Sequence, residues 1–83
     1  MTKNEKYLKT FFEEKDLPDV NWLIEAKDGM EHHISNEVVI EYIMVATDEE
    51  QDAIVETLRK IDFFNGDVNH FLNYLAHGLV ENY

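Results

Sequence analysis

VNWLIEAKDGMEHHI, residues 20–34, decides the fold of this chain. Asp28-Gly29 stands between two short segments with strand-like composition, which is typical of a β-hairpin. A two-residue loop would set Leu23 opposite Ile34 and scatter the apolar side chains over both faces. A three-residue loop, in which Gly29 is left-handed, collects them on one face. We therefore predict a hairpin over residues 20–34 with the three-residue loop.

The three-residue loop gives the hairpin one apolar face and one exposed face. The apolar face carries Trp22, Ile24, Ala26, Met30, His32 and Ile34. Glu25 then opposes Glu31, a like-charge pair that is destabilising. His32 and His33 are neighbours on a strand and point to opposite faces, so they cannot hold one metal ion together. Because the chain also has no cysteine, we expect no metal site and no cofactor.

The segment before the hairpin has a helical pattern, and we predict a helix over residues 2–15. Thr2 and Glu5 have the spacing of a capping box. The apolar side chains recur on one side, at Tyr7, Leu8, Phe11 and Phe12. Such a stripe occurs at partner grooves but far more often faces the core. Pro18 cannot continue a helix, so it separates this segment from the hairpin.

Residues 36–46 support two interpretations. Their β-branched content favours a strand, whereas Ser35 as a cap and the i,i+4 placing of Glu37 and Glu41 favour a helix. We predict the helix. Only its Glu37 and Glu41 side is expected to meet water, which places the rest at the centre of the domain or in a subunit contact.

A second capping box, Thr47 to Glu50, begins the helix predicted over residues 48–64. Arg59 and Lys60 lie near its end, where the helix dipole favours positive charge. The expected core side consists of Ile54, Val55, Leu58 and Ile61. The other side carries acids with few compensating bases, since residues 47–64 contain six acids and two bases.

Asn65-Gly66 follows this helix directly, where a left-handed residue satisfies free carbonyls. Asp67 is placed to cap a last helix, predicted over residues 68–80. The inward side chains of that helix are expected to be Val68, Leu72, Leu75 and Leu79. The expected contacts of the corner with the core are Phe63, Phe64 and Phe71. The stretch is thus predicted to be a helix–helix corner, since it lacks a phosphate-binding glycine pattern.

Charge excludes several classes of function. Eighteen acids and seven bases give the chain a net charge of −11, so nucleic acids and anionic membranes repel it. Residues 67–78, the recognition helix of a hypothetical helix-turn-helix, contain no Lys or Arg.

The longest apolar run, residues 42–46, is too short to cross a bilayer. Lacking cysteine and an apolar leader, the protein is expected to be cytoplasmic.

The sequence contains no nucleophile, zinc-protease or nucleotide-binding motif, and we expect neither a catalytic site nor an enzyme. His70, Tyr74 and His77 share a helical side, and Asp67 lies one turn from His70, so an acid–base pair can be drawn. The two histidines are about two helical turns apart, too far to hold one metal directly. A chain of this size also rarely encloses a substrate pocket.

These patterns predict one α+β domain over residues 1–83, in the order α-β-β-α-α-α, with one β-hairpin packed on a helical cluster. Two functions fit a domain of this kind. The first is a module that binds a basic protein surface through Asp48, Glu49, Asp52 and Glu56. An inhibitor or accessory protein of a phage or mobile element acts in this way. The alternative is a homo-oligomeric structural protein whose charge only solvates it. Small size and the apolar segment 38–46 favour a homodimer over a monomer.

Overall fold

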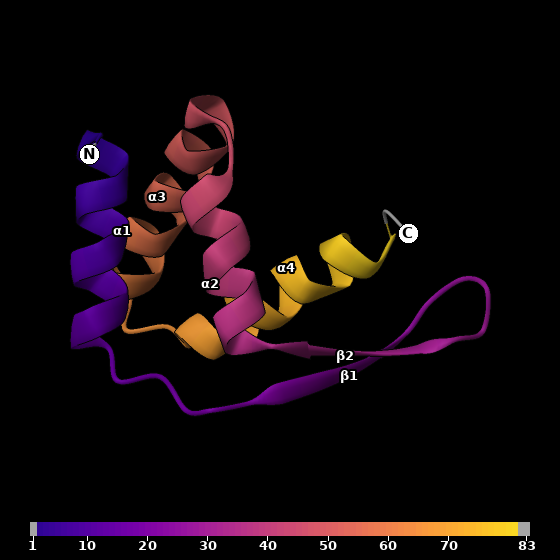
Figure 1. Ribbon diagram of the computed structural model, residues 1–83. Coiled ribbons are helices and arrows are strands. Elements are labelled where there is room, and N and C mark those ends of the chain that lie inside the picture. The colour runs from indigo at the N-terminus through magenta and orange to yellow at the C-terminus, as the bar shows by residue number, and fades with distance from the viewer. Residues whose placement is uncertain (1, 82–83) are drawn as a thin grey trace.

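The computed structural model describes residues 2–81 (Figure 1). Its helices are α1 (Lys3–Glu14), α2 (Asn36–Val45), α3 (Asp48–Phe63) and α4 (Val68–Glu81), and its strands are β1 (Asn21–Glu25) and β2 (Glu31–Ser35). The strands form one antiparallel hairpin. The α+β class and the order α-β-β-α-α-α are therefore confirmed, and residues 36–45 form the predicted helix.

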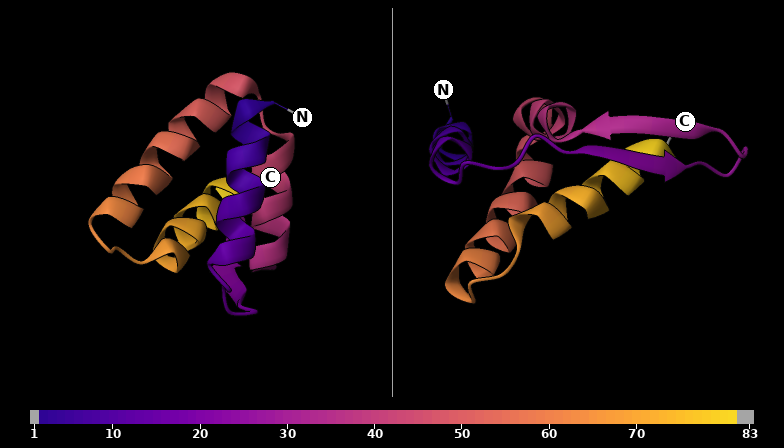
Figure 2. Two further views of the ribbon diagram at one scale, coloured as in Figure 1. Left: turned by 90° about the vertical axis from the view of Figure 1, so that its left-hand side faces the viewer. Right: turned by 90° about the horizontal axis from the view of Figure 1, so that it is seen from below.

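The elements form two layers, seen most clearly from below (Figure 2, right). α1, α2 and the hairpin lie side by side in one layer, and α3 and α4 run along one side of it. α1 packs on α3, α2 packs on both α3 and α4, and α4 also packs on β1. The fully buried apolar residues between the layers are Leu8, Val39, Ile43, Leu58, Leu72 and Ala76.

The hairpin has the predicted register. Trp22 pairs with Ile34 and Ile24 with His32, so these four side chains share one face. The turn has the predicted form as well, because Gly29 is left-handed with a φ of 83°. Met30 lies on the same face but is exposed, since the tip of the hairpin extends past the helices (Figure 1).

Side-chain caps begin all four helices, as the sequence predicts. In each case a side-chain oxygen accepts a hydrogen bond from a backbone N–H two or three residues later. The pairs are Thr2 with Glu5 (3.1 Å), Ser35 with Val38 (3.2 Å), Thr47 with Glu50 (3.2 Å) and Asp67 with Asn69 (2.9 Å). Helix starts are thus set by short local contacts.

Residues 64–67 form the helix–helix corner. The N–H of Gly66 donates to the carbonyl of Ile61 at 2.7 Å, and the N–H of Asn65 donates to Asp62 at 3.2 Å. Asn65 is left-handed, with a φ of 55°. Together these features make a Schellman motif, which satisfies the last carbonyls of α3.

The expectation that Phe63 and Phe64 hold this corner against the core is wrong. Their side chains are 80% and 76% exposed. The helical repeat explains Phe63, because it lies two residues after Ile61, which packs against the core, and so points about 200° away from it around the helix axis. Phe71 does pack partly against the core.

Two further expectations are corrected. α2 exposes Val38 and Val45 as well as its glutamates, because it packs through Val39 and Ile43 on the opposite side. In α4 the buried residues after Leu72 are Ala76 and Val80, while the predicted leucines 75 and 79 are half-buried. Because α4 contacts both α2 and β1, its core side is wider than the predicted stripe.

Candidate functional site on helix α3 and the α3–α4 corner

The four acidic residues predicted as a binding site lie together on the structure. Asp48, Glu49, Asp52 and Glu56 are all exposed. At about 100° per residue, their positions fall within an arc of about 100° around α3. This arc lies away from the buried side of the helix, which carries Ile54 and Leu58. We call these four residues the acidic side of α3.

Two of the four carboxylates already have partners within the chain. The amide of Asn4 donates to Asp52 Oδ1 at 2.6 Å, which joins α1 to α3. Lys60 Nζ lies 3.3 Å from Glu56 Oε1, and both side chains are largely exposed. An exposed pair one turn apart contributes little to stability, so Glu56 remains accessible to a partner. Within residues 2–81, Asp48 and Glu49 form no ion pair.

A third acid of the first turn, Glu50, has a structural role instead. Its carboxylate accepts hydrogen bonds from the Thr47 hydroxyl at 2.9 Å and the Tyr42 hydroxyl at 3.0 Å. These bonds hold the pKa of Glu50 below its ordinary value, and the bond from Thr47 has the largest effect. The bond to Glu50 raises the pKa of Tyr42 above its ordinary value, and burial has the next largest effect in the same direction. Glu50 thus links α2 to the start of α3.

Two further bases, one on α3 and one at the end of α1, lie at the contact between these helices. The Arg59 guanidinium lies over the Tyr7 ring, 4.7 Å from its centroid. Lys15 forms an ion pair with Asp62 and lies 5.1 Å from the centroid of the Phe11 ring. Both cations therefore help to hold α1 on α3 and leave the acidic side largely uncompensated.

Exposed aromatic residues continue from the acidic side. Phe63 lies seven residues, or about two turns, after Glu56 on the same side of α3. Its ring meets that of Phe64 edge to face, with centroids 5.0 Å apart. On α4, Tyr74 is exposed and stacks on Phe71 at 6.4 Å. Phe71 and Tyr74 line a shallow hollow of about 510 Å³ with Ile61, Asp67 and His70.

We call Phe63, Phe64, Phe71 and Tyr74 the aromatic corner. The sequence predicted all three phenylalanines to contact the core, which is wrong for Phe63 and Phe64 and correct in part for Phe71. The helical spacing from Ile61 was the signal that could have placed Phe63 on the surface.

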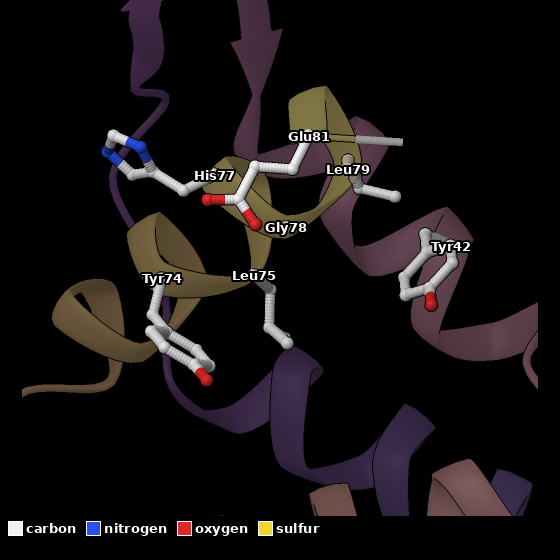
Figure 3. A pocket seen from close by; sticks show the side chains of 7 residues that line it. All are labelled: Tyr42, Tyr74, Leu75, His77, Gly78, Leu79 and Glu81. Atoms are coloured by element: carbon white, nitrogen blue, oxygen red, sulfur yellow. The ribbon is translucent and has the colours of Figure 1, made fainter. Parts of the chain in front are cut away.

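A second hollow, of about 400 Å³, lies over α4 (Figure 3). Its lining residues are Tyr42, Tyr74, Leu75, His77, Gly78, Leu79 and Glu81. His77 and Tyr42 lie at opposite ends of this group, with the two leucines between them. At one of these ends, the Tyr42 hydroxyl is already engaged, because it donates a hydrogen bond to Glu50.

Asp67 and His70, the acid–base pair drawn from the sequence, both line the hollow at the α3–α4 corner, but within residues 2–81 no ion pair joins them. Asp67 Oδ1 instead accepts the Asn69 N–H and caps α4. Within residues 2–81 no three His, Asp or Glu side chains are grouped to hold a metal ion. In the same part of the chain, no helix has the length and apolar character needed to cross a membrane.

No protein-family model, curated protein or solved structure matches the chain.

Proposed function

We propose that the protein is an interaction module that binds a basic surface of a partner protein through the acidic side of α3 and the aromatic corner. One observation carries this proposal: exposed Phe63 continues the same side of α3 that bears the four carboxylates. Carboxylates attract a basic partner over a long range, whereas a buried aromatic side chain supplies affinity at contact.

The exposed phenylalanines support the proposal because folding does not account for them. Two adjacent Phe side chains, each more than three-quarters exposed, leave apolar area in water. Protein interfaces place aromatic residues at their centre and polar residues around them. From Asp48 to Phe63 the surface extends over about 22 Å of helix, a length suited to one side of a typical interface.

The partner in this proposal is a protein whose basic surface otherwise binds nucleic acid. With a net charge of −11, the module competes for that surface and does not bind nucleic acid itself. This is the activity of an inhibitor or accessory protein such as phages and mobile elements encode. A cytoplasmic location is part of the same proposal.

A homo-oligomer is the second candidate, and exposed apolar residues on α2 favour it. Val38 and Val45 lie two turns apart on one side of α2, and Val45 is 81% exposed. In a homodimer these valines would meet a second copy. Salt separates the two candidates, because added salt weakens attraction to a basic partner but relieves repulsion between two acidic copies.

Capture from the native host, followed by mass spectrometry, tests the proposal. The bait is compared with a variant carrying Asp48→Asn, Glu49→Gln, Asp52→Asn and Glu56→Gln, here called the α3 variant. A control variant with the same charge change carries substitutions elsewhere, namely Glu14→Gln, Glu25→Gln, Glu31→Gln and Glu81→Gln.

A partner with a basic surface that is retained by wild type and the control variant, but lost by the α3 variant, supports the proposal. Equal capture by all three baits contradicts it. Circular dichroism checks that each variant is folded, since exposed carboxylates contribute little to stability beyond the dipole effect of the first turn.

A further inference from the structure

α1 and α2 run in opposite directions with a groove between them. They lie side by side in the first layer, and α1 packs on α3 below (Figures 1 and 2). One hollow, of about 240 Å³, is lined by Lys9, Phe12, Glu13, Ile40 and Met44. A second, of about 360 Å³, is lined by Leu17, Pro18, Asp19, Asn36, Glu37, Ile40 and Glu41. Ile40 belongs to both, so the two hollows adjoin.

The groove has an apolar floor. Phe12 and Leu17 line it from the side of α1 and the following linker, and Ile40 and Met44 line it from α2. All four side chains are half-buried, so the floor remains open to solvent. From Asn36 to Met44 the groove follows α2 for about 12 Å, or a little more than two helical turns.

The rim of the groove is acidic. Its charged side chains are Glu13, Asp19, Glu37 and Glu41, with Lys9 as the one cation among the lining residues. All five are exposed. None of the four carboxylates forms an ion pair with another residue of the described chain, 2–81. With four acids and one base, the rim carries a net negative charge beside the apolar floor.

We propose that this groove binds an amphipathic helix of a partner protein, with large apolar side chains on one face and Lys or Arg at its edges. Charge complementarity identifies the occupant, because a basic helix neutralises the rim while its apolar face covers the floor. Ile40 and Met44 are one turn apart, which matches apolar side chains spaced by three and four residues on the bound helix.

A second copy of the chain is a poorer occupant. In residues 3–14, α1 contains the highest density of lysines, but it already packs on α3 through Leu8 and Phe11. α2 and α4 contain no Lys or Arg, and α3 contains more acids than bases. Two acidic rims would repel each other, whereas a basic helix is attracted from a distance.

The groove and the acidic side of α3 are separate surfaces, so this proposal does not depend on the function proposed above. The two sets of four carboxylates provide matched controls for each other. The groove variant carries Glu13→Gln, Asp19→Asn, Glu37→Gln and Glu41→Gln, and it changes the net charge by the same amount as the α3 variant.

The probe is a synthetic, fluorescently labelled peptide whose Leu residues recur every three and four positions and whose other residues are Lys, Arg and Ala. Fluorescence anisotropy measures its affinity for each protein at low salt. We expect the groove variant to bind about tenfold more weakly than wild type, and the α3 variant to differ from wild type by about threefold at most. A peptide with Ser in place of Leu should bind far more weakly than the original to the wild-type protein.

Amide chemical shifts of the wild-type protein locate the peptide without any substitution. The proposal expects perturbations at residues 9–19 and 36–44. Equal losses for the two variants would show that only net charge attracts the peptide and would overturn the proposal. Three other results would also overturn it. They are perturbations centred on α3, no binding at low salt, and chemical-shift changes at the groove that depend on protein concentration when no peptide is present.

Discussion

Trp22 Nε1 donates a hydrogen bond to Asn36 Oδ1 at 2.7 Å, which ties β1 to the first turn of α2. The amide nitrogen of Asn36 donates in turn to the Pro18 carbonyl at 3.0 Å and to Asn69 Oδ1 at 2.9 Å. Asn36 is buried. One side chain therefore joins the linker, the hairpin, α2 and α4, and it fixes how the hairpin lies on α4.

Replacing Asn36 with Ala should lower the free energy of unfolding by about 1–3 kcal/mol, because several polar partners lose a hydrogen bond at a buried position. Trp22→Phe removes one donor but keeps most of the ring, so it should cost less. Urea unfolding measures both. A loss below about 0.5 kcal/mol for Asn36→Ala would mean that water replaces these contacts.

Leu58→Ala should cost about 2–5 kcal/mol. Leu58 is fully buried on α3, and truncation leaves a cavity between the two layers. Urea unfolding gives the value, with exposed Thr10→Ala on α1 as a control for small substitutions on a helix surface. If Leu58→Ala unfolds at the wild-type midpoint, the buried side of α3 is assigned incorrectly.

The double substitution Phe63→Ser and Phe64→Ser should change stability by about 0.5 kcal/mol or less, because both rings lie mostly in water. Losing two phenylalanines from a core would cost several kcal/mol each. The same urea experiment therefore decides whether Phe63 and Phe64 belong to the surface or to the core. A loss comparable with that of Leu58→Ala would return them to the core.

Glu50 should make stability depend on pH. Hydrogen bonds from Thr47 and Tyr42 lower its pKa in the folded state below the ordinary value of 4.5. Its contribution is therefore present above pH 4.5 and is lost as pH falls through the lowered pKa. The difference in unfolding free energy between wild type and Glu50→Gln should shrink over that range. A difference that stays constant down to pH 3 would contradict the role of this carboxylate.

Tyr42 gives a second test of the same contact at high pH. Its pKa is raised above 10.0 by the hydrogen bond to Glu50 and by burial. Stability from this group is present below pH 10.0 and is lost as pH rises through the raised pKa. Absorbance titration should show the Tyr42 pKa closer to its ordinary value in Glu50→Gln.

Local patterns predicted the elements of this fold because short-range interactions determine them. The face of the hairpin followed from the alternation of apolar residues around Gly29, and the observed pairing of Trp22 with Ile34 agrees with it. The helix starts followed from cap residues, whose contacts span two or three positions. The two-layer arrangement did not follow from these patterns.

Contacts between distant segments were beyond the reach of sequence reasoning. The hydrogen bond from Asn36 to Asn69 spans 33 positions, and no periodicity indicates it. Buried Gln51 was also missed: it donates to the carbonyls of Ile43 and Met44, only eight and seven positions earlier, but no apolar periodicity or capping pattern indicates a buried polar side chain there. The groove between α1 and α2 depends on how two helices pack on a third, so only the structure reveals it.

The proposed function rests on attraction between the acidic side of α3 and a basic partner. The most direct test is the association rate of the captured partner with wild type and with the α3 variant, measured by stopped-flow mixing from low to physiological salt. We predict slower association for the α3 variant at low salt. The difference should narrow as salt rises, since charges are screened over about 10 Å at 0.1 M. Equal association rates for the two proteins at low salt would contradict the proposal.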